Sequence, residues 1–323
     1  MERYYRDYSS WLMEKYGERV YKLPINLTQA NCPNRDGRIG YGGCDFCDAT
    51  GSGFHLLPDA LSIKEQVAEN KAFYQRRFSC QKFIAYFQSF SNTYVSLDVF
   101  KEAMYEGTDD PDIVGLSLST RPDLLHPAYL EVLQELAEER HLDIDIELGL
   151  QTVNYHTLED MNRGHGLAEF IDAVLRAHAC GFRVCAHVIL NLPGDDHLDV
   201  EETARVLSAL KVDFVKLHSL YIVGGTPLAK RYVKGEFQMI SLEEYVDRAV
   251  DFLELLDPDM VISRLVGKGP QEKLIFCNWD TSWWRIKDAI NDSFARRGSH
   301  QGSRFSYLKG ALMEDMLKGG HEA

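Results

Sequence analysis

The sequence has no long apolar run and no excess of basic residues, and each absence excludes a class of protein. No segment approaches the length of about 20 apolar residues that a membrane-spanning helix requires. The first twenty residues, MERYYRDYSSWLMEKYGERV, contain no apolar core of the kind found in secretory signal peptides. With 35 basic against 49 acidic residues, the net charge of -14 argues against non-specific binding to DNA or anionic membranes. We therefore expect a cytoplasmic protein with neither a membrane nor DNA as a partner.

The cysteines divide into one cluster and four scattered residues. Seven cysteines in a chain of 323 residues do not indicate a small disulfide-stapled module. In a reducing compartment, cysteine spacing points first to metal binding or catalysis. Three cysteines lie in one Gly-rich segment, at positions 32, 44 and 47. We assign no functional role to the other four, which are Cys80, Cys180, Cys185 and Cys277.

Short apolar segments alternate with amphipathic helical segments through most of the chain. The strand candidates are VYKLPINL (20–27), KFIAYFQSF (82–90), DIVGLSLST (112–120), IDIELGLQT (144–152), RVCAHVILNLP (183–193) and DFVKLHSLYIV (213–223). Residues 167–181 repeat apolar side chains at helical spacing, and a later helix is predicted to begin with a capping box of Ser241 and Glu244. Strands that are apolar nearly throughout predict a parallel sheet with a covered outer face. A barrel-like βα array and a doubly wound sheet both fit this pattern.

The loop after the first strand carries the clustered cysteines. In TQANCPNRDGRIGYGGCDFCDATGSGF they have the spacing C-x11-C-x2-C. Loops that follow the strands of a βα barrel build its active site, so the position suits chemistry. A structural zinc site closes with four Cys or His ligands, and the nearest histidine is His55, eight residues past Cys47. A cubane cluster held by three cysteines leaves one iron open for a small molecule. The ligand count favours the cluster, and a zinc site that uses His55 is the alternative.

The cysteine segment CPNRDGRIGYGGCDFC resembles the cluster-binding loop of the YhcC-like branch of the radical S-adenosylmethionine superfamily. This branch is related to the Elongator catalytic subunit and the oxygen-independent coproporphyrinogen oxidases. The common superfamily spacing is C-x3-C-x2-C, and the eleven-residue first gap found here is a habit of this branch. The resemblance covers nearly the whole chain and includes FQSFSNTY (87–94), LSTRPD (118–123), ELGLQT (147–152), MNRGHG (161–166), ILNLPGD (189–195) and LYIVGGTPLA (220–229).

The resemblance implies an α/β fold, a partial (βα)6 TIM-like barrel of parallel strands with a C-terminal α/β extension. It implies a 4Fe-4S cluster on Cys32, Cys44 and Cys47 that binds S-adenosylmethionine. An electron donor of the flavodoxin or ferredoxin type would reduce the cluster, and cleavage of S-adenosylmethionine would give a 5′-deoxyadenosyl radical that abstracts hydrogen from an unknown substrate. We divide the chain into an N-terminal helical lead-in (1–18), the barrel (19–258) and the extension (259–323).

The resemblance also implies cofactor-binding residues on several loops. Phe46 matches the aromatic residue that lies near the adenine in the superfamily. Gln88 and Ser89 end the second strand, where relatives hold the amino group of the cofactor. Asn191 ends the fifth strand, where relatives meet the adenosyl portion.

Two arginines compete for the carboxylate of the cofactor. Thr120 and Arg121 end the third strand, and Arg121 suits a carboxylate because a guanidinium matches it in a bidentate fork. Arg163 lies in the segment that follows the fourth strand and suits the same role. Glu147 and Gln151 share a face of the fourth strand, because their offset is even. They either face the cofactor or belong to a buried hydrogen-bond network.

The C-terminal extension supplies the candidate substrate-binding residues, which are Arg264, Lys268, Trp279, Trp283 and Trp284. From position 268 to 309 basic residues outnumber acidic ones. A solvated helix surface is the first interpretation of this local excess, and the alternative is a site for an anionic substrate such as RNA, by analogy with the Elongator relative. A zinc-stabilised binding module without catalysis is the alternative from another functional class. No catalytic side chain is assigned.

Overall fold

The computed structural model describes residues 3–48, 51, 57, 61–270 and 273–313. Its strands are β1 (Val20–Ile25), β2 (Lys82–Phe87), β3 (Ile113–Thr120), β4 (Asp143–Gln151), β5 (Arg183–Ile189), β6 (Phe214–His218), β7 (Ile222–Val223), β8 (Val261–Arg264) and β9 (Leu274–Phe276). Its α-helices are α1 (Tyr8–Tyr16), α2 (Ile63–Phe78), α3 (Leu97–Gly107), α4 (Pro127–Arg140), α5 (Tyr155–Asp160), α6 (Leu167–Ala179), α7 (His197–Ala209), α8 (Pro227–Val233), α9 (Leu242–Leu255) and α10 (Trp283–Arg297). Three short 3-10 helices lie at Pro122–Leu124, Asn278–Asp280 and Ala311–Met313.

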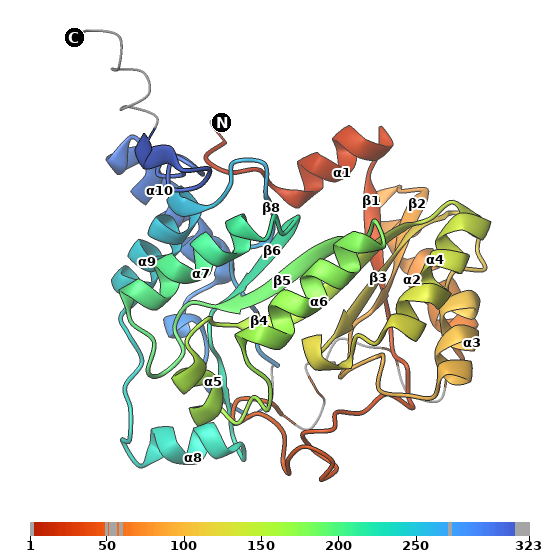
Figure 1. Ribbon diagram of the computed structural model, residues 1–323, viewed down its shortest axis with the longest axis horizontal. Coiled ribbons are helices and arrows are strands. Elements are labelled where there is room, and N and C mark those ends of the chain that lie inside the picture. Colours follow the sequence, from red (N-terminus) through yellow and green to blue (C-terminus); the bar gives the residue numbers. More distant parts are fainter. Residues whose placement is uncertain (1–2, 49–50, 52–56, 58–60, 271–272, 314–323) are drawn as a thin grey trace, which may run out of the picture.

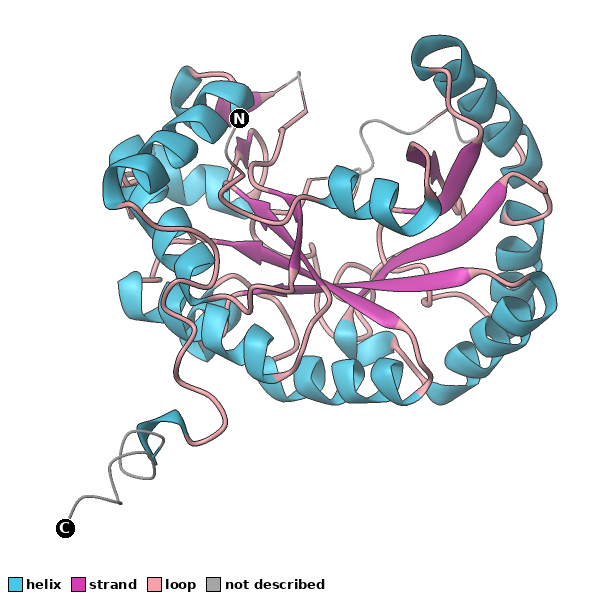
Figure 2. Ribbon diagram, turned by 90° about the horizontal axis from the view of Figure 1, so that it is seen from above, coloured by secondary structure: helices cyan, strands magenta, loops and turns pink. Residues whose placement is uncertain are grey.

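Seven strands form one parallel sheet in the order β1-β2-β3-β4-β5-β6-β8. The order follows the sequence and never reverses, which excludes the doubly wound alternative, whose strand order reverses at a switch point. The sheet curls into a partial barrel with helices around its outer face (Figure 1 and Figure 2). The predicted partial TIM-like barrel is confirmed, and β8, from the predicted extension, adds a seventh parallel strand.

The sixth predicted strand is shorter in the structure than in the sequence interpretation. Residues 213–223 divide into β6 and the two-residue β7, which pairs with β9 in a separate antiparallel ladder. The break follows from a side-chain contact, because the backbone N–H of Leu220 donates to Oδ1 of Asn191 at 2.8 Å. That bond directs the chain out of the parallel sheet after His218.

The two outer strands of the sheet have polar partners along their free edges. Pro24 lies in β1, where a missing N–H is tolerated because the strand is at an edge. Asn70 of α2 donates to the Pro24 carbonyl at 2.8 Å. At the other edge, the N–H of Ile262 in β8 donates to the Arg6 carbonyl at 2.8 Å. Such contacts satisfy backbone groups that would otherwise invite pairing with another chain.

Helix α1 covers the amino ends of the strands, opposite the loop that follows β1 (Figure 1). Leu12 packs with Val20 and Ile84, and the Trp11 ring lies edge-on to Phe214 with centroids 4.9 Å apart. Burial of these apolar side chains closes this end of the barrel. Any cavity in the barrel therefore opens toward the carboxyl ends of the strands.

The predicted capping box at the start of α9 forms only in part. The Ser241 side chain accepts from the Glu244 N–H, as expected for an N-cap. The Glu244 carboxylate, however, pairs with Arg248 at 2.8 Å and does not return to the Ser241 backbone. An ion pair one turn along the helix has replaced the second half of the box. None of the helices in the described ranges is both long and apolar enough to span a bilayer.

Candidate active site

A cavity of about 530 Å³ lies at the carboxyl ends of the strands, beside the cysteine loop. Its volume is in the range of pockets that bind small molecules and cofactors. The predicted site residues on its wall are Cys32, Cys44, Phe46, Cys47, Gln88, Thr120, Arg121, Glu147, Gln151 and Arg163. The fold thus gathers residues from β2, β3, β4 and their loops around the three cysteines.

Two predicted cofactor-binding residues, Ser89 and Asn191, do not line the cavity. Ser89 is buried and its hydroxyl donates to Oδ1 of Asn26 at 2.6 Å. Because β2 ends at Phe87, strand alternation no longer decides where Ser89 points. Asn191 follows the end of β5, and its Oδ1 is occupied by the Leu220 N–H. Through these hydrogen bonds, both residues connect neighbouring loops.

The cysteine loop folds so that the eleven residues between Cys32 and Cys44 do not hold these two cysteines apart. The N–H of Gly43 donates to the Asn34 carbonyl at 2.8 Å, and Asp36 and Tyr41 form an antiparallel bridge within the excursion. Residues 35–42 therefore leave and return to the same place. The N–H of Cys47 then donates to the Cys44 carbonyl at 2.8 Å, a tight turn that directs both sulfurs toward the cavity.

Nitrogen donors surround the sulfurs of the cysteine loop. Nη1 of Arg163 lies 3.3 Å from Sγ of Cys44, and Nη1 of Arg35 lies 3.8 Å from Sγ of Cys47. Guanidinium donors stabilise the negative charge of thiolates, which are the form that binds metal. The surroundings therefore suit an anionic metal–thiolate group.

The sulfurs of the three cysteines are not arranged around a single zinc ion. Within the described residues, these three cysteines do not form a set whose ligand atoms all lie within 4.8 Å of one another. Sulfurs around a tetrahedral zinc ion lie about 3.8 Å apart, given Zn–S bonds of about 2.3 Å. His55, the fourth ligand of the zinc alternative, lies outside the described residues.

The two competing arginines have different surroundings. The guanidinium of Arg121 forms a fork with Asp123, with N–O distances of 3.0 and 2.9 Å, and Nη1 donates to the Arg163 carbonyl. Arg163 donates from Nη2 to the Gly149 carbonyl at 2.7 Å, while its Nε is buried without a hydrogen-bond partner. A Cβ on Gly149 would lie 2.5 Å from Nη2 of Arg163, so a larger residue at position 149 would displace the guanidinium from this place. Arg163 is therefore the arginine with a free donor.

A buried carboxylate, that of Glu147, lies at the centre of a polar layer inside the barrel. Its oxygens accept hydrogen bonds from Lys22 (2.6 Å), Lys216 (2.6 Å), His187 (2.7 Å), Tyr86 (2.9 Å), Ser117 (3.1 Å) and Ser119 (3.4 Å). Burial alone would raise the pKa of Glu147, but Lys216 and Lys22 outweigh it and hold the pKa well below the usual value. The carboxylate is therefore charged.

Buried histidines in and beside the cavity are neutral at neutral pH. Burial, followed by the nearby Lys216, lowers the pKa of His187 to about 4, so His187 donates its Nε2 proton to Glu147 as a neutral ring. Burial, followed by Arg163 and Arg121, lowers the pKa of His165 to about 2. His165 consequently carries no acidic proton for catalysis near neutral pH.

Comparison with known families gives two matches that together span most of the chain. Residues 29–207 match the radical SAM superfamily, and residues 212–296 match the radical SAM C-terminal domain. The protein YtqA of Bacillus subtilis is 36% identical over 308 residues, which are 95% of this chain and 95% of YtqA. The chain belongs to the radical SAM superfamily.

Relatives of this radical SAM protein confirm the branch that the sequence resemblance indicated. YhcC of Escherichia coli is 33% identical over 273 residues, covering 84% of this chain and 86% of YhcC. The solved structure of archaeal Elp3 from Methanocaldococcus infernus superposes with a TM-score of 0.66 at 14% identity, over 87% of this chain and 64% of that chain. At such low identity the likeness shows a shared fold. Membership of this superfamily favours an enzyme over a zinc-stabilised binding module.

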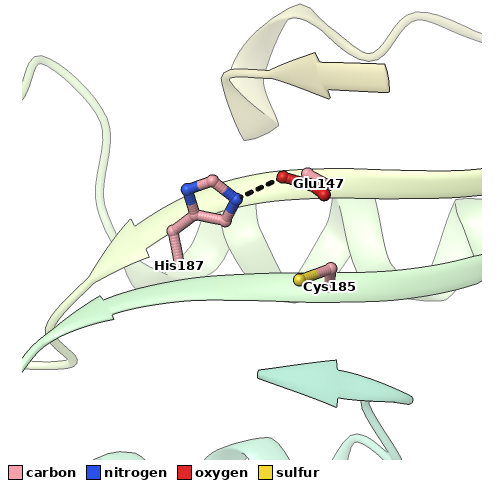
Figure 3. Close-up of side chains that lie close together, drawn as sticks. All are labelled: Glu147, Cys185 and His187. Carbon is pink, nitrogen blue, oxygen red and sulfur yellow. Dashed lines mark hydrogen bonds and ion pairs between the residues drawn. The ribbon is translucent and has the colours of Figure 1, made fainter. Parts of the chain in front are cut away.

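A second group of potential metal ligands in this radical SAM protein is a poor cation site. The ligand atoms of Glu147, Cys185 and His187 all lie within 4.8 Å of one another, and Figure 3 shows the His187 ring directed at the carboxylate. Two lysine ammonium groups already bind that carboxylate, and a metal ion would have to approach them. Burial, followed by Glu147, raises the pKa of Cys185, which disfavours the thiolate. We assign the group to the polar layer.

Sequence reasoning missed the lysines of this layer, although the sequence contained a signal for them. Lys22 lies in the apolar strand VYKLPI and Lys216 in FVKLH. A charged residue inside an apolar strand needs a buried partner or a polar cavity, and this holds for Glu147 as well. Applied to all strands, this argument selects Lys22 and Lys216 in addition to Glu147, and also Asp145 and Arg183, which pair at 2.6 Å.

Replacement of Glu147 by Gln is expected to lower the free energy of unfolding by about 3–5 kcal/mol, because two buried ammonium groups lose their counter-charge. Glu135→Gln is the control, since Glu135 pairs with Lys101 on the exposed surface and the change should cost about 1 kcal/mol or less. Urea unfolding followed by circular dichroism measures both. Adding Lys216→Met to the Glu147 variant should recover part of the loss. Equal stability of the two Gln variants would contradict the proposed ion pairing.

Proposed function

We propose that this radical SAM enzyme holds a 4Fe-4S cluster on Cys32, Cys44 and Cys47 and binds S-adenosylmethionine in the same cavity. Members of the superfamily typically use this pair of cofactors. When bound and reduced by one electron, the pair supplies a 5′-deoxyadenosyl radical and methionine, and the radical abstracts a hydrogen atom from a substrate. The observation that carries the proposal is the convergence of three cysteine sulfurs and two arginine donors on one cavity wall.

The residues of the chain provide separate contacts for the parts of the cofactor. The free Nε of Arg163 suits the cofactor carboxylate, since a buried guanidinium nitrogen without a partner is costly. Phe46 packs against an apolar cluster that contains Ile189 and Leu192, at the end of β5. This surface suits the adenine ring, which needs an apolar contact. The Arg121 guanidinium already pairs with Asp123. Its Nη1 donates to the backbone carbonyl of Arg163, so Arg121 positions the segment that contains Arg163.

Replacement of Cys44 by Ala is expected to abolish the brown iron–sulfur chromophore and the formation of 5′-deoxyadenosine, because the site loses one of three protein ligands. The assay uses anaerobic protein reconstituted with iron and sulfide, reduced with dithionite and supplied with S-adenosylmethionine. Cys277→Ala is the matched control, since Cys277 is half-buried and does not line the cavity. A comparable loss in the Cys277 variant would show that the ligand set is wrong. Stoichiometric zinc in place of iron would contradict the proposal.

Replacement of Arg163 by Lys is expected to weaken S-adenosylmethionine binding about tenfold or more. Lysine keeps the charge but loses the planar donors, and a charge-assisted hydrogen bond contributes about 1.5–3 kcal/mol. Equilibrium dialysis with the reconstituted protein measures the Kd, with Arg176→Lys as the control because Arg176 pairs with Asp172 on the surface. A weaker Kd in Arg121→Lys with an unchanged Kd in Arg163→Lys would reverse the assignment of the two arginines.

A further inference from the structure

The cavity wall is cationic, although the chain as a whole carries a net charge of -14. Among the described residues, one carboxylate lines it, that of Glu147. The cations on the wall are Arg35, Arg121, Arg163, Lys216, Arg264 and Lys268. The buried cations of this wall require a partner or a ligand, whereas Arg264 and Lys268 are exposed to solvent.

Four of these six cations have partners in the structure. Arg121 pairs with Asp123, and Lys216 pairs with Glu147. Arg35 and Arg163 approach the cysteine sulfurs and backbone carbonyls. Arg264 and Lys268 remain, and within the described part of the chain neither has an ion-pair partner.

Arg264 and Lys268 lie at the side of the cavity formed by β6, β8 and the segment after β8. Arg264 ends β8 and is in register with Lys216 of β6, so its side chain starts beside the polar layer. Burial, followed by the charge of Arg264, lowers the pKa of the neighbouring His218, whose Nε2 is buried without a hydrogen-bond partner. Lys268 lies 5.1 Å from the ring centroid of Trp283, a cavity residue that is 43% exposed.

Arg264 and Lys268 lie at a different place along the sheet from Arg163, the residue proposed to bind the cofactor carboxylate. Arg163 is anchored at Gly149 of β4, whereas Arg264 belongs to β8. In the order β4-β5-β6-β8 these strands are three spacings apart, or about 14 Å at about 4.8 Å per spacing. The two arginines therefore belong to different parts of the cavity wall. The unpaired cations on β8 and after it are available to a second anionic group.

We propose that Arg264 and Lys268, with Nε2 of His218, bind a carboxylate or phosphate group of the substrate at the β8 side of the cavity. This assignment rests on the proposed function, because it treats the remainder of the cavity as the cofactor site. A guanidinium binds either anion through paired N–H donors, and an ammonium adds a point charge. The basic residues farther along the chain do not extend this site. Arg297 and Arg304, for example, pair with Asp251 of α9.

The test is anion binding to the full-length, anaerobically reconstituted protein. Inorganic phosphate and succinate are titrated separately at low ionic strength, and binding is followed by calorimetry and by tryptophan fluorescence, since Trp283 contacts Lys268. We expect saturable binding to the wild type. The double variant R264Q/K268Q is expected to bind about tenfold or more weakly, because two charged donors are lost.

A matched double variant separates a local site from a general effect of charge. K287Q/R296Q also removes two positive charges, but from residues of α10 that do not line the cavity. It should bind both anions as the wild type does. Equal weakening in the two double variants, equal binding in R264Q/K268Q and wild type, or no saturable binding of either anion would each overturn the proposal.

The two anions identify the chemical class of the substrate group. Saturable binding of phosphate alone indicates a phosphate group, and binding of succinate alone indicates a carboxylate. Iron content and thermal unfolding of R264Q/K268Q check that the fold and the cysteine site are intact. Anion binding is measured without turnover, so a failure to form 5′-deoxyadenosine in the wild type would count against the proposed function and leave the anion result readable.

Discussion

In an open barrel no hydrogen bonds join the first strand to the last, so other contacts have to hold the sheet in its curved shape. Here those contacts are made by the buried carboxylate of Glu147. In the described structure the sheet ends at β1 on one side and β8 on the other. Six consecutive strands each supply at least one side chain to the layer around this carboxylate, namely Lys22, Tyr86, Ser117 with Ser119, Glu147 itself, His187 and Lys216. Lys22 and Lys216, from strands five positions apart in the sheet order, meet on one carboxylate. That is possible only in a strongly curved sheet, so the charge pairing and the curvature require each other.

The same layer determines the electrostatics of the cavity above it. Two ammonium groups bind one carboxylate and leave the interior positive. Burial is the main cause that lowers the pKa of His187 and His218, and the charge of Lys216 adds to it for both. Neutral histidines donate or accept hydrogen bonds without adding charge. The cavity therefore attracts anions. A net negative surface and a positive cavity also favour an anionic ligand in the cavity over anion binding elsewhere on the protein.

Sequence reasoning succeeded where a repeating pattern extends through a whole element. The six apolar runs correspond to strands of the sheet, and the even offset of Glu147 and Gln151 placed both on the cavity wall, although the ladder between β4 and β5 is irregular at Gly149 and Gln151. Ser89 and Asn191, which the resemblance suggested, lie just past strand ends and do not line the cavity. Strand alternation gives no guide to their direction, because it stops where the ladder stops. The pairing of Glu244 with Arg248 shows another limit. Two local motifs competed for one side chain, and the sequence contained both.

The cysteine loop shows why ligand spacing along the chain differs from ligand spacing in space. A cluster requires sulfurs at certain distances, whereas a sequence motif counts the residues between them. The N–H of Gly43 donates to the Asn34 carbonyl, so the two ends of residues 35–42 lie side by side. These eight residues therefore add almost nothing to the separation of Cys32 and Cys44 in space. Cys44 then follows Asn34 almost as if the excursion were absent. The length of residues 35–42 is thus free to vary provided that its two ends stay bonded, and this explains how an eleven-residue gap is compatible with a site that other members of the superfamily build with three residues.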